Sequence, residues 1–145
     1  MPKTTFGKLG NDMSGLNFPK SERLTHKQLW NAVFEQGKRI KCFPLQLYYL
    51  KTEQAQTEQP LSAQIQVGIS VPKKRFPLAV DRNHIKRLLR ENYRHKKQTV
   101  FNNTKGSYAL VILYLGKELP HNAEISSALD KLIDKFLHHE ATIET

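Results

Sequence analysis

Apolar and polar residues alternate in several stretches of the chain, and these stretches predict β-strands. Residues 45–50 alternate with a period of two, as in a half-buried strand. The alternation is clearest over residues 65–71. The run SYALVILYL at 107–115 is almost continuously apolar, which predicts a strand buried on both faces. The pattern also allows a short extra strand near Ile40.

Apolar residues at helical spacing predict three helices in other segments. The first covers about 25–36, where Thr25 begins a capping-box pattern. The second starts at Arg82, and Asp81 stands where an N-terminal cap would help. The third follows Asn122, which can act as its cap, and it is strongly amphipathic.

The predicted order is helix, strand, strand, helix, strand, helix. This order predicts an α+β fold, a small α-β sandwich in which helices cover one side of a sheet of three or four strands. Residues 21–140 form this single domain. We expect residues 1–20 to be a flexible, mildly basic arm, residues 51–62 to be a polar loop between strands, and residues 141–145 to be a tail.

The balance of charges points to a polyanionic partner. The chain has 23 Lys and Arg against 13 Asp and Glu, a formal net charge of +10, and a pI near 9.8. A charge of this size on a small domain usually accompanies binding to nucleic acid or to an anionic membrane. No stretch approaches the roughly 20 apolar residues that span a bilayer, so we expect nucleic acid and no membrane. Cys42 is the only cysteine, and nothing directs the chain out of the cytosol, so we expect a cytoplasmic protein.

The second predicted helix has a basic face, which is the strongest candidate for a binding site. At about 100° per residue, five basic side chains fall within an arc of roughly 100°, separate from the apolar residues. The basic loop PKKR at 72–75 lies just upstream, and arginine suits phosphate oxygens. A solvated face on an ordinary amphipathic helix is the alternative. The five residues of this arc are Lys86, Arg87, Arg90, Arg94 and Lys97.

The stretch RNHIKRLLRE at 82–91 resembles the Arg-Asn-Arg-x-Lys-Arg signature of the bacterial ribonuclease P protein subunit. Further segments resemble that family in the same order: RLTHKQLWNAVFEQGKRI, VGISVPKKR, and YALVILYLG followed by the last helix. Together they cover about residues 21–138. One position departs from the signature, because His84 stands where the family usually has Arg. Histidine is largely neutral at pH 7, so we expect a weaker or pH-dependent contact there.

The resemblance implies the protein subunit of ribonuclease P, an endonuclease whose catalytic centre is a large RNA that binds most of the required Mg²⁺. Its partners would be that ribonuclease P RNA and precursor tRNA, from which the enzyme removes the 5′ leader. The resemblance also implies a left-handed crossover, an exception to the usual handedness. It implies no catalytic or metal-binding residue on the protein, and the sequence does not indicate an oligomeric state. The residues implied to contact RNA are Arg82, Asn83, His84, Lys86, Arg87, Arg90 and Arg94 in the helix, and Lys73, Lys74 and Arg75 in the loop.

Trp30, Phe34 and Tyr48 are the aromatic residues that the resemblance assigns to a cleft for the single-stranded leader. Trp30 and Phe34 lie one helical turn apart, which is also usual for core packing, so both interpretations stay open. A second hypothesis for the chain is a ribosomal or nucleoid-type protein that binds nucleic acid without a role in cleavage. A third is a protein-only nuclease, which would need clustered carboxylates; the acids of this chain are scattered.

Overall fold

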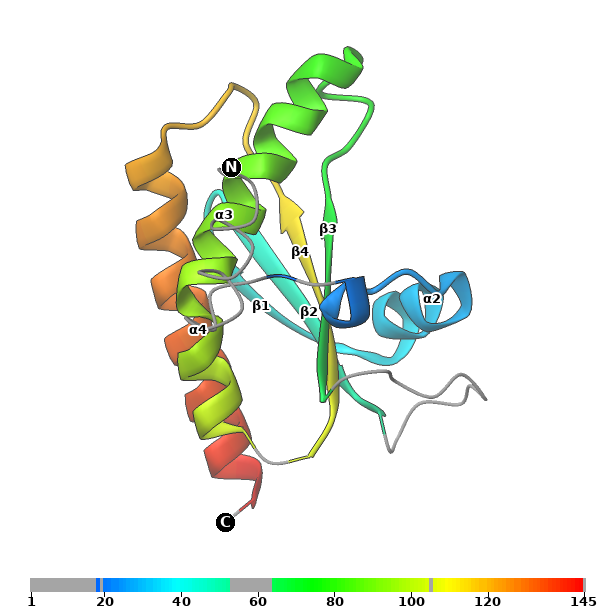
Figure 1. Cartoon of the computed structure of the whole chain (residues 1–145), viewed down its shortest axis with the longest axis vertical. Coiled ribbons are helices and arrows are strands. Elements are labelled where there is room, and N and C mark those ends of the chain that lie inside the picture. Colours follow the sequence, from blue (N-terminus) through cyan, green and yellow to red (C-terminus); the bar gives the residue numbers. More distant parts are fainter. Residues whose placement is uncertain (1–17, 19, 53–63, 105, 145) are drawn as a thin grey trace, which may run out of the picture.

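The computed structural model describes residues 18, 20–52, 64–104 and 106–144 (Figure 1). Almost all of the arm expected at 1–20, and most of the loop expected at 51–62, lie outside the described residues. The elements, in chain order, are the 3₁₀-helix η1 (Lys20–Glu22), α2 (Lys27–Gln36), β1 (Lys38–Cys42), β2 (Leu45–Lys51), β3 (Ile65–Ser70), α3 (Ala79–Asn103), β4 (Tyr108–Tyr114) and α4 (Asn122–Glu144).

The observed order of helices and strands confirms the prediction. β1 is the short extra strand expected near Ile40, and it pairs with β2 in antiparallel fashion. The four-stranded sheet has the order β1-β2-β4-β3. β4 is antiparallel to β2 and parallel to β3, so the sheet is mixed and the fold is α+β. The connection from β3 through α3 to β4 is the crossover for which the resemblance implies a left hand.

Helices cover both faces of the sheet, because the strands place apolar residues alternately on each side. Tyr108, Leu110 and Ile112 of β4 join a core cluster with residues of α3 and α4. Ala109 and Val111 join a second cluster with residues of α2. Figure 1 shows α3 and α4 together on one side of the strands and α2 on the other. The prediction that β4 is buried on both faces is therefore confirmed, and the prediction that helices cover only one side of the sheet is wrong.

The start of α2 differs from the predicted start. The helix begins at Lys27, with His26 at the N-cap and no side-chain capping hydrogen bond, so Thr25 does not cap it. The chain just before α2 is held to β3, because the Leu24 N–H donates to the Val67 carbonyl at 2.9 Å. This attachment, which the local sequence pattern does not reveal, keeps the chain extended up to the helix.

The other two helices are longer than predicted. α3 has Leu78 at its N-cap, without a side-chain capping bond, so Asp81 is not the cap. Asp81 lies in the first turn, where its charge favours the positive end of the helix dipole. α4 begins at Asn122 itself, whose Oδ1 accepts a hydrogen bond from Asn92 Nδ2 of α3 at 2.9 Å. It continues to Glu144, into the segment expected to be a tail.

Candidate nucleic-acid interface

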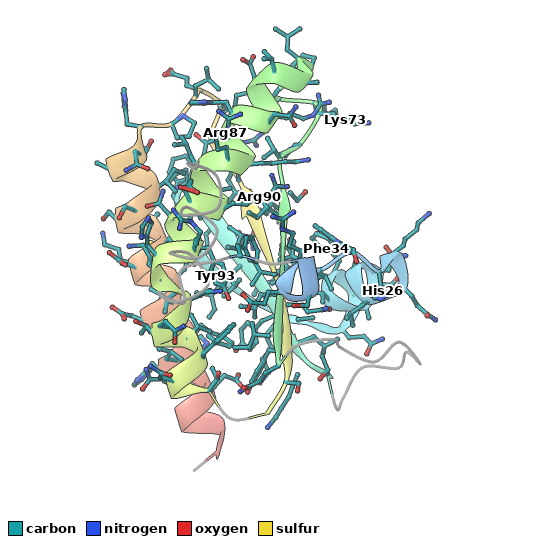
Figure 2. The ribbon with its side chains drawn as sticks, in the orientation of Figure 1. His26, Phe34, Lys73, Arg87, Arg90 and Tyr93 are labelled. Atoms are coloured by element: carbon teal, nitrogen blue, oxygen red, sulfur yellow. The ribbon has the colours of Figure 1, made fainter. Side chains whose placement is uncertain are left out.

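A cavity with a basic lining lies along the first half of α3 and is the main candidate for an interface with nucleic acid. Its volume is about 610 Å³. Figure 2 shows Arg87 and Arg90 along α3, and both side chains are exposed. At a spacing of i, i+3 they lie on the same side of the helix. The residues that line this basic cavity are Phe18, Arg23, Asn83, Arg87, Arg90, Glu91 and Arg94.

Arg23 reaches the basic cavity from outside α3 and was missing from the predicted site. Its backbone forms a parallel bridge with Val67 of β3, and its Nη2 donates to the Phe18 carbonyl at 3.2 Å. Its guanidinium carbon lies 5.4 Å from the centre of the Phe18 ring, within cation–π range. The periodicity of one helix cannot reveal such a residue. The available signal was its place at the start of RLTHKQLW, a segment that resembles the ribonuclease P family.

The arginines of the basic cavity repel one another. Partial burial lowers the pKa of Arg90 from its usual value, and the positive charge of Arg23 lowers it further. Arg90 still carries its charge at neutral pH, because guanidinium groups are not deprotonated in proteins. An anion bound between these side chains would relieve the repulsion, so the basic cavity favours a phosphate.

Two basic residues of the predicted arc have acidic partners within the protein. Arg94 Nη2 lies 2.9 Å from Glu91 Oε2, and its Nε lies 3.3 Å from Oε1. This hydrogen bonding is the main reason why the pKa of Glu91 lies below its usual value. Lys97 is buried, with its Nζ 2.8 Å from Glu22 Oε1. The prediction that Lys97 belongs to the exposed basic arc is therefore wrong, because η1 supplies a partner that helical periodicity does not reveal.

Arg82 connects α3 to the basic loop before it. Its Nη1 donates to the carbonyls of Phe76 and Pro77 at 2.8 and 2.9 Å. Arg75, in the same loop, donates to the carbonyl of Leu115. Some N–H groups of Arg82 and Arg75 are therefore used in hydrogen bonds that fix the basic loop. Only the remaining N–H groups of these two side chains can reach a ligand. Of the other predicted RNA-binding residues, Lys73 (Figure 2), Lys74, Asn83 and His84 are exposed, and Lys86 is half-buried.

Trp30, Phe34 and Tyr48 form a continuous aromatic row on the face of the sheet that α2 covers. The Trp30 and Phe34 rings are 6.0 Å apart and nearly parallel, and Phe34 meets Tyr48 edge-on at 4.7 Å. Trp30 is anchored, because its Nε1 donates to the Leu24 carbonyl at 2.7 Å and its ring lies against Gly68. Phe34 is 40% exposed. Trp30 is therefore packed, whereas Phe34 offers a ring to the solvent, and the leader cleft stays a prediction.

The basic cavity and the aromatic row meet at the chain segment before α2. Arg23 lines the cavity, and the carbonyl of Leu24 accepts the Trp30 hydrogen bond. Both residues are held to the edge of the sheet by Val67 of β3. The aromatic surface therefore lies beside a cationic one, a combination that suits single-stranded nucleic acid.

The part of the chain that the structure describes holds neither a metal site nor a membrane-spanning helix. No three of its His, Cys, Asp or Glu side chains are grouped so that they could hold a metal ion. Asp130 of α4 instead forms an ion pair with Lys96 of α3 at 2.7 Å. None of the helices in the described ranges is both long enough and apolar enough to cross a membrane.

Comparison with known proteins identifies the family. The family model described as Ribonuclease P matches residues 18–137. The ribonuclease P protein component of Chlorobium phaeobacteroides is 44% identical over 92 residues, which are 61% of this chain and 62% of that protein. The corresponding component of Xylella fastidiosa is 34% identical over 116 residues, covering 80% of this chain and 76% of the relative.

Two solved structures share the fold. The RNase P protein of Thermotoga maritima superposes with a TM-score of 0.59 at 21% identity, covering 79% of this chain and 96% of that one. The RNase P protein of Staphylococcus aureus gives a TM-score of 0.57 at 20% identity, with coverages of 87% and 97%. The family model spans most of the sequence, from residue 18 to residue 137 in α4. The chain therefore belongs to the ribonuclease P protein family.

Proposed function

We propose that this chain is the protein subunit of ribonuclease P, which assists the endonucleolytic removal of the 5′ leader from precursor tRNA. The observation that carries the proposal is the basic cavity, where Arg23, Arg87 and Arg90 converge. Within the described residues, none of these three has a carboxylate at ion-pair distance. The cavity also holds Glu91, which pairs with Arg94, so these three arginines are the ones suited to the phosphates of an RNA backbone.

In this proposal the catalytic RNA lies along the exposed side of α3. Arg87 and Arg90 contact phosphates directly, and Arg23 adds a third cation from the segment before α2. Asn83, His84 and Lys86 lie on the same half of the helix, and Lys73 and Lys74 extend the positive surface into the β3–α3 loop. Support comes from the family resemblance, because the residues of α3 lie in the signature stretch at 82–91 and the other residues lie in the segments RLTHKQLW and VGISVPKKR.

The single-stranded leader lies over the aromatic row. Phe34 is the ring most available for stacking, because 40% of its surface is exposed while Trp30 is packed against Gly68. Base–aromatic stacking contributes about 1–3 kcal/mol per base and tolerates any base, which suits a leader of variable sequence. The nearness of Arg23 to this row would bring a phosphate contact beside the stacked base.

The chemistry itself belongs to the RNA in this proposal. The RNA binds most of the Mg²⁺, and the metal supplies the activated water and the charge stabilisation that hydrolysis of a phosphodiester needs. The protein then contributes binding and orientation, and no catalytic residue is assigned to it. We place this tRNA maturation in the cytoplasm.

Reconstitution tests the proposal most directly. The protein is added to a matching ribonuclease P RNA and precursor tRNA at low Mg²⁺, and 5′-leader cleavage is followed. We expect stimulation over the RNA alone, because the cations of the protein reduce the repulsion between the two RNAs. Binding without stimulation would support the ribosomal or nucleoid alternative, and cleavage by the protein in the absence of the RNA would restore the protein-only hypothesis.

The salt dependence of RNA binding tests the basic cavity itself. Each phosphate contact contributes about 0.7–0.9 to the slope of log affinity against log salt. The double variant Arg87→Ala, Arg90→Ala should therefore reduce the slope by about 1.4–1.8. Arg39→Ala is the matched control, because Arg39 is an exposed arginine on β1, at the opposite edge of the sheet from β3. A slope that is unchanged in the double variant would mean that this face is only solvated.

A further inference from the structure

A second cavity, of about 590 Å³, lies at one end of the sheet and shares no lining residue with the basic cavity. Two of the most exposed apolar side chains of the described residues line it, Phe43 at 66% and Leu119 at 49% exposure. Its volume lies within the usual range of small-ligand sites. We call it the sheet-end cavity.

Three connections build the sheet-end cavity. Phe43 and Pro44 form the turn between β1 and β2, Arg75 comes from the β3–α3 loop, and residues 115–121 connect β4 to α4. Figure 1 shows the β3–α3 loop and the β4–α4 connection at the same end of the molecule. Leu115 holds the three together, because its N–H donates to the Pro44 carbonyl at 2.7 Å and its own carbonyl accepts from Arg75.

The charged side chains of the sheet-end cavity are of both signs. Lys41, Arg75 and Lys117 supply positive charge, and Glu118 and Glu124 supply carboxylates. Arg75 belongs to the same loop as Lys73 and Lys74, so this cavity continues the positive surface of the proposed RNA-binding face. An exposed aromatic ring with cations around it is the arrangement that binds an unpaired nucleotide.

We propose that the sheet-end cavity binds one unpaired nucleotide of RNA. The base stacks on Phe43, the phosphate lies near Lys41, Arg75 and Lys117, and the N–H groups of the base donate to a glutamate. Guanine fits best, because its N1–H and N2 amino group lie side by side and can both donate to one carboxylate. Uracil has a single N–H between two carbonyls, and these carbonyls would face the negative charge.

The composition of the cavity favours a nucleotide over other occupants. A purely apolar ligand would use Phe43 and Leu119 but none of the five charged side chains, and inorganic phosphate alone would leave Phe43 exposed. The inference rests on the proposed function in one respect, since it takes RNA to be the partner of the chain. The two can nevertheless fail separately, because a mononucleotide probes this cavity without the ribonuclease P RNA.

The test is an NMR titration of the full-length ¹⁵N-labelled chain with guanosine monophosphate, uridine monophosphate and inorganic phosphate at constant ionic strength. We expect guanosine monophosphate to shift the backbone amide signals of Phe43, Gly116 and Lys117, uridine monophosphate to shift them less, and inorganic phosphate to leave the Phe43 signal in place. Phe43→Ala should abolish the nucleotide response, and Phe43→Tyr should keep it. Because Phe43 is mostly exposed, these changes should leave the fold intact.

Val80→Ala is the matched control, since Val80 is 72% exposed but lies outside the sheet-end cavity. It should retain the full response. With the complete RNA, Phe43→Ala should weaken binding by roughly 5- to 140-fold, the range expected for one lost stacking contact.

The possible failures are distinct. No response to guanosine monophosphate, in a chain that still stimulates leader cleavage, would overturn the sheet-end cavity and leave the proposed function intact. Equal responses to the two nucleotides would overturn the role given to the glutamates. A full nucleotide response without any stimulation of cleavage would support this cavity while removing the proposed function.

Discussion

The aromatic row depends on a residue that has no side chain. A Cβ atom built at Gly68 would lie closest to Trp30 Cζ2, and it would also lie 2.9 Å from Cη2 and 3.0 Å from Cε2, whereas ordinary contacts begin at 3.4 Å. In Gly68→Ala the indole must therefore retreat by more than the roughly 0.5 Å that Cη2 alone requires, and overpacking of this kind costs about 1–3 kcal/mol. Without the clash, the same change would stabilise the strand slightly, because glycine is unfavourable in a strand interior. The sign of the stability change thus reports whether the ring is fixed.

The assay uses the only tryptophan of the chain. Urea unfolding gives the free-energy change, and the emission spectrum of Trp30 reports its displacement. The Nε1 hydrogen bond to Leu24 opposes that displacement, and Phe34, stacked on Trp30, must follow it. We expect precursor tRNA to bind the Gly68→Ala holoenzyme up to about tenfold more weakly, since part of one stacking contact is lost, while the affinity for the catalytic RNA stays unchanged.

A double-mutant cycle separates the clash from other effects of the alanine. Trp30→Phe removes the part of the indole that Cβ would meet, so Gly68→Ala should cost much less in that background. Equal costs in both backgrounds would show that the clash is not the cause. A neutral or stabilising Gly68→Ala in the wild-type background would refute the claim that Trp30 is fixed against β3.

Three further changes concern charges around α3. Glu22→Gln leaves the buried Lys97 ammonium without its acidic partner and should cost about 3 kcal/mol in urea unfolding. Glu91→Gln should raise RNA affinity at low salt, since it removes the carboxylate from the basic cavity. The hydrogen bond from Arg94 lowers the pKa of Glu91. The pair therefore stabilises the fold at pH values above the ordinary glutamate pKa, by less than about 1 kcal/mol because it is exposed. This stabilisation is lost as the pH falls through the lowered pKa. His84→Arg should strengthen RNA binding at low salt, because arginine always carries its charge and its planar fork suits phosphate oxygens; an unchanged affinity would exclude a phosphate contact at this position.

The strands were predictable because their signal is local. Alternation places β2 and β3, and a continuous apolar run places β4, within one or two residues of their observed ends. Even β1 can be anticipated around its one buried residue, Ile40. The arrangement of the helices on the two faces of the sheet has no such local signal in the sequence. The small and branched residues Ala109 and Val111 indicate that both faces of β4 are covered, but the sequence does not say which helix covers which face.

The binding site was predictable in part for a similar reason. Helical periodicity and the family resemblance identify Arg87 and Arg90 because they lie on one element. Arg23 comes from a segment more than sixty residues away and reaches the basic cavity only because it pairs with Val67 of β3. A contact of this kind depends on the packing of the sheet edge, which no pattern within α3 encodes.

The signature stretch therefore contains arginines with two different roles, one in internal hydrogen bonds and one in the proposed binding of phosphates. The sequence alone cannot tell these two roles apart. Arg82 and Arg90 both lie in the signature stretch RNHIKRLLRE, yet Arg82 donates to two carbonyls of the loop before α3, while Arg90 lines the basic cavity together with Arg23. Removing Arg82 would disturb the loop that presents Lys73 as well as any phosphate contact of its own. Removing Arg90 takes away charge and leaves no internal acceptor unpaired in the described structure. Phosphate contacts can be measured cleanly only by substituting residues such as Arg90, whose removal leaves no internal hydrogen bond broken. The internal hydrogen bonds of the protein, rather than the sequence motif, decide which residues these are.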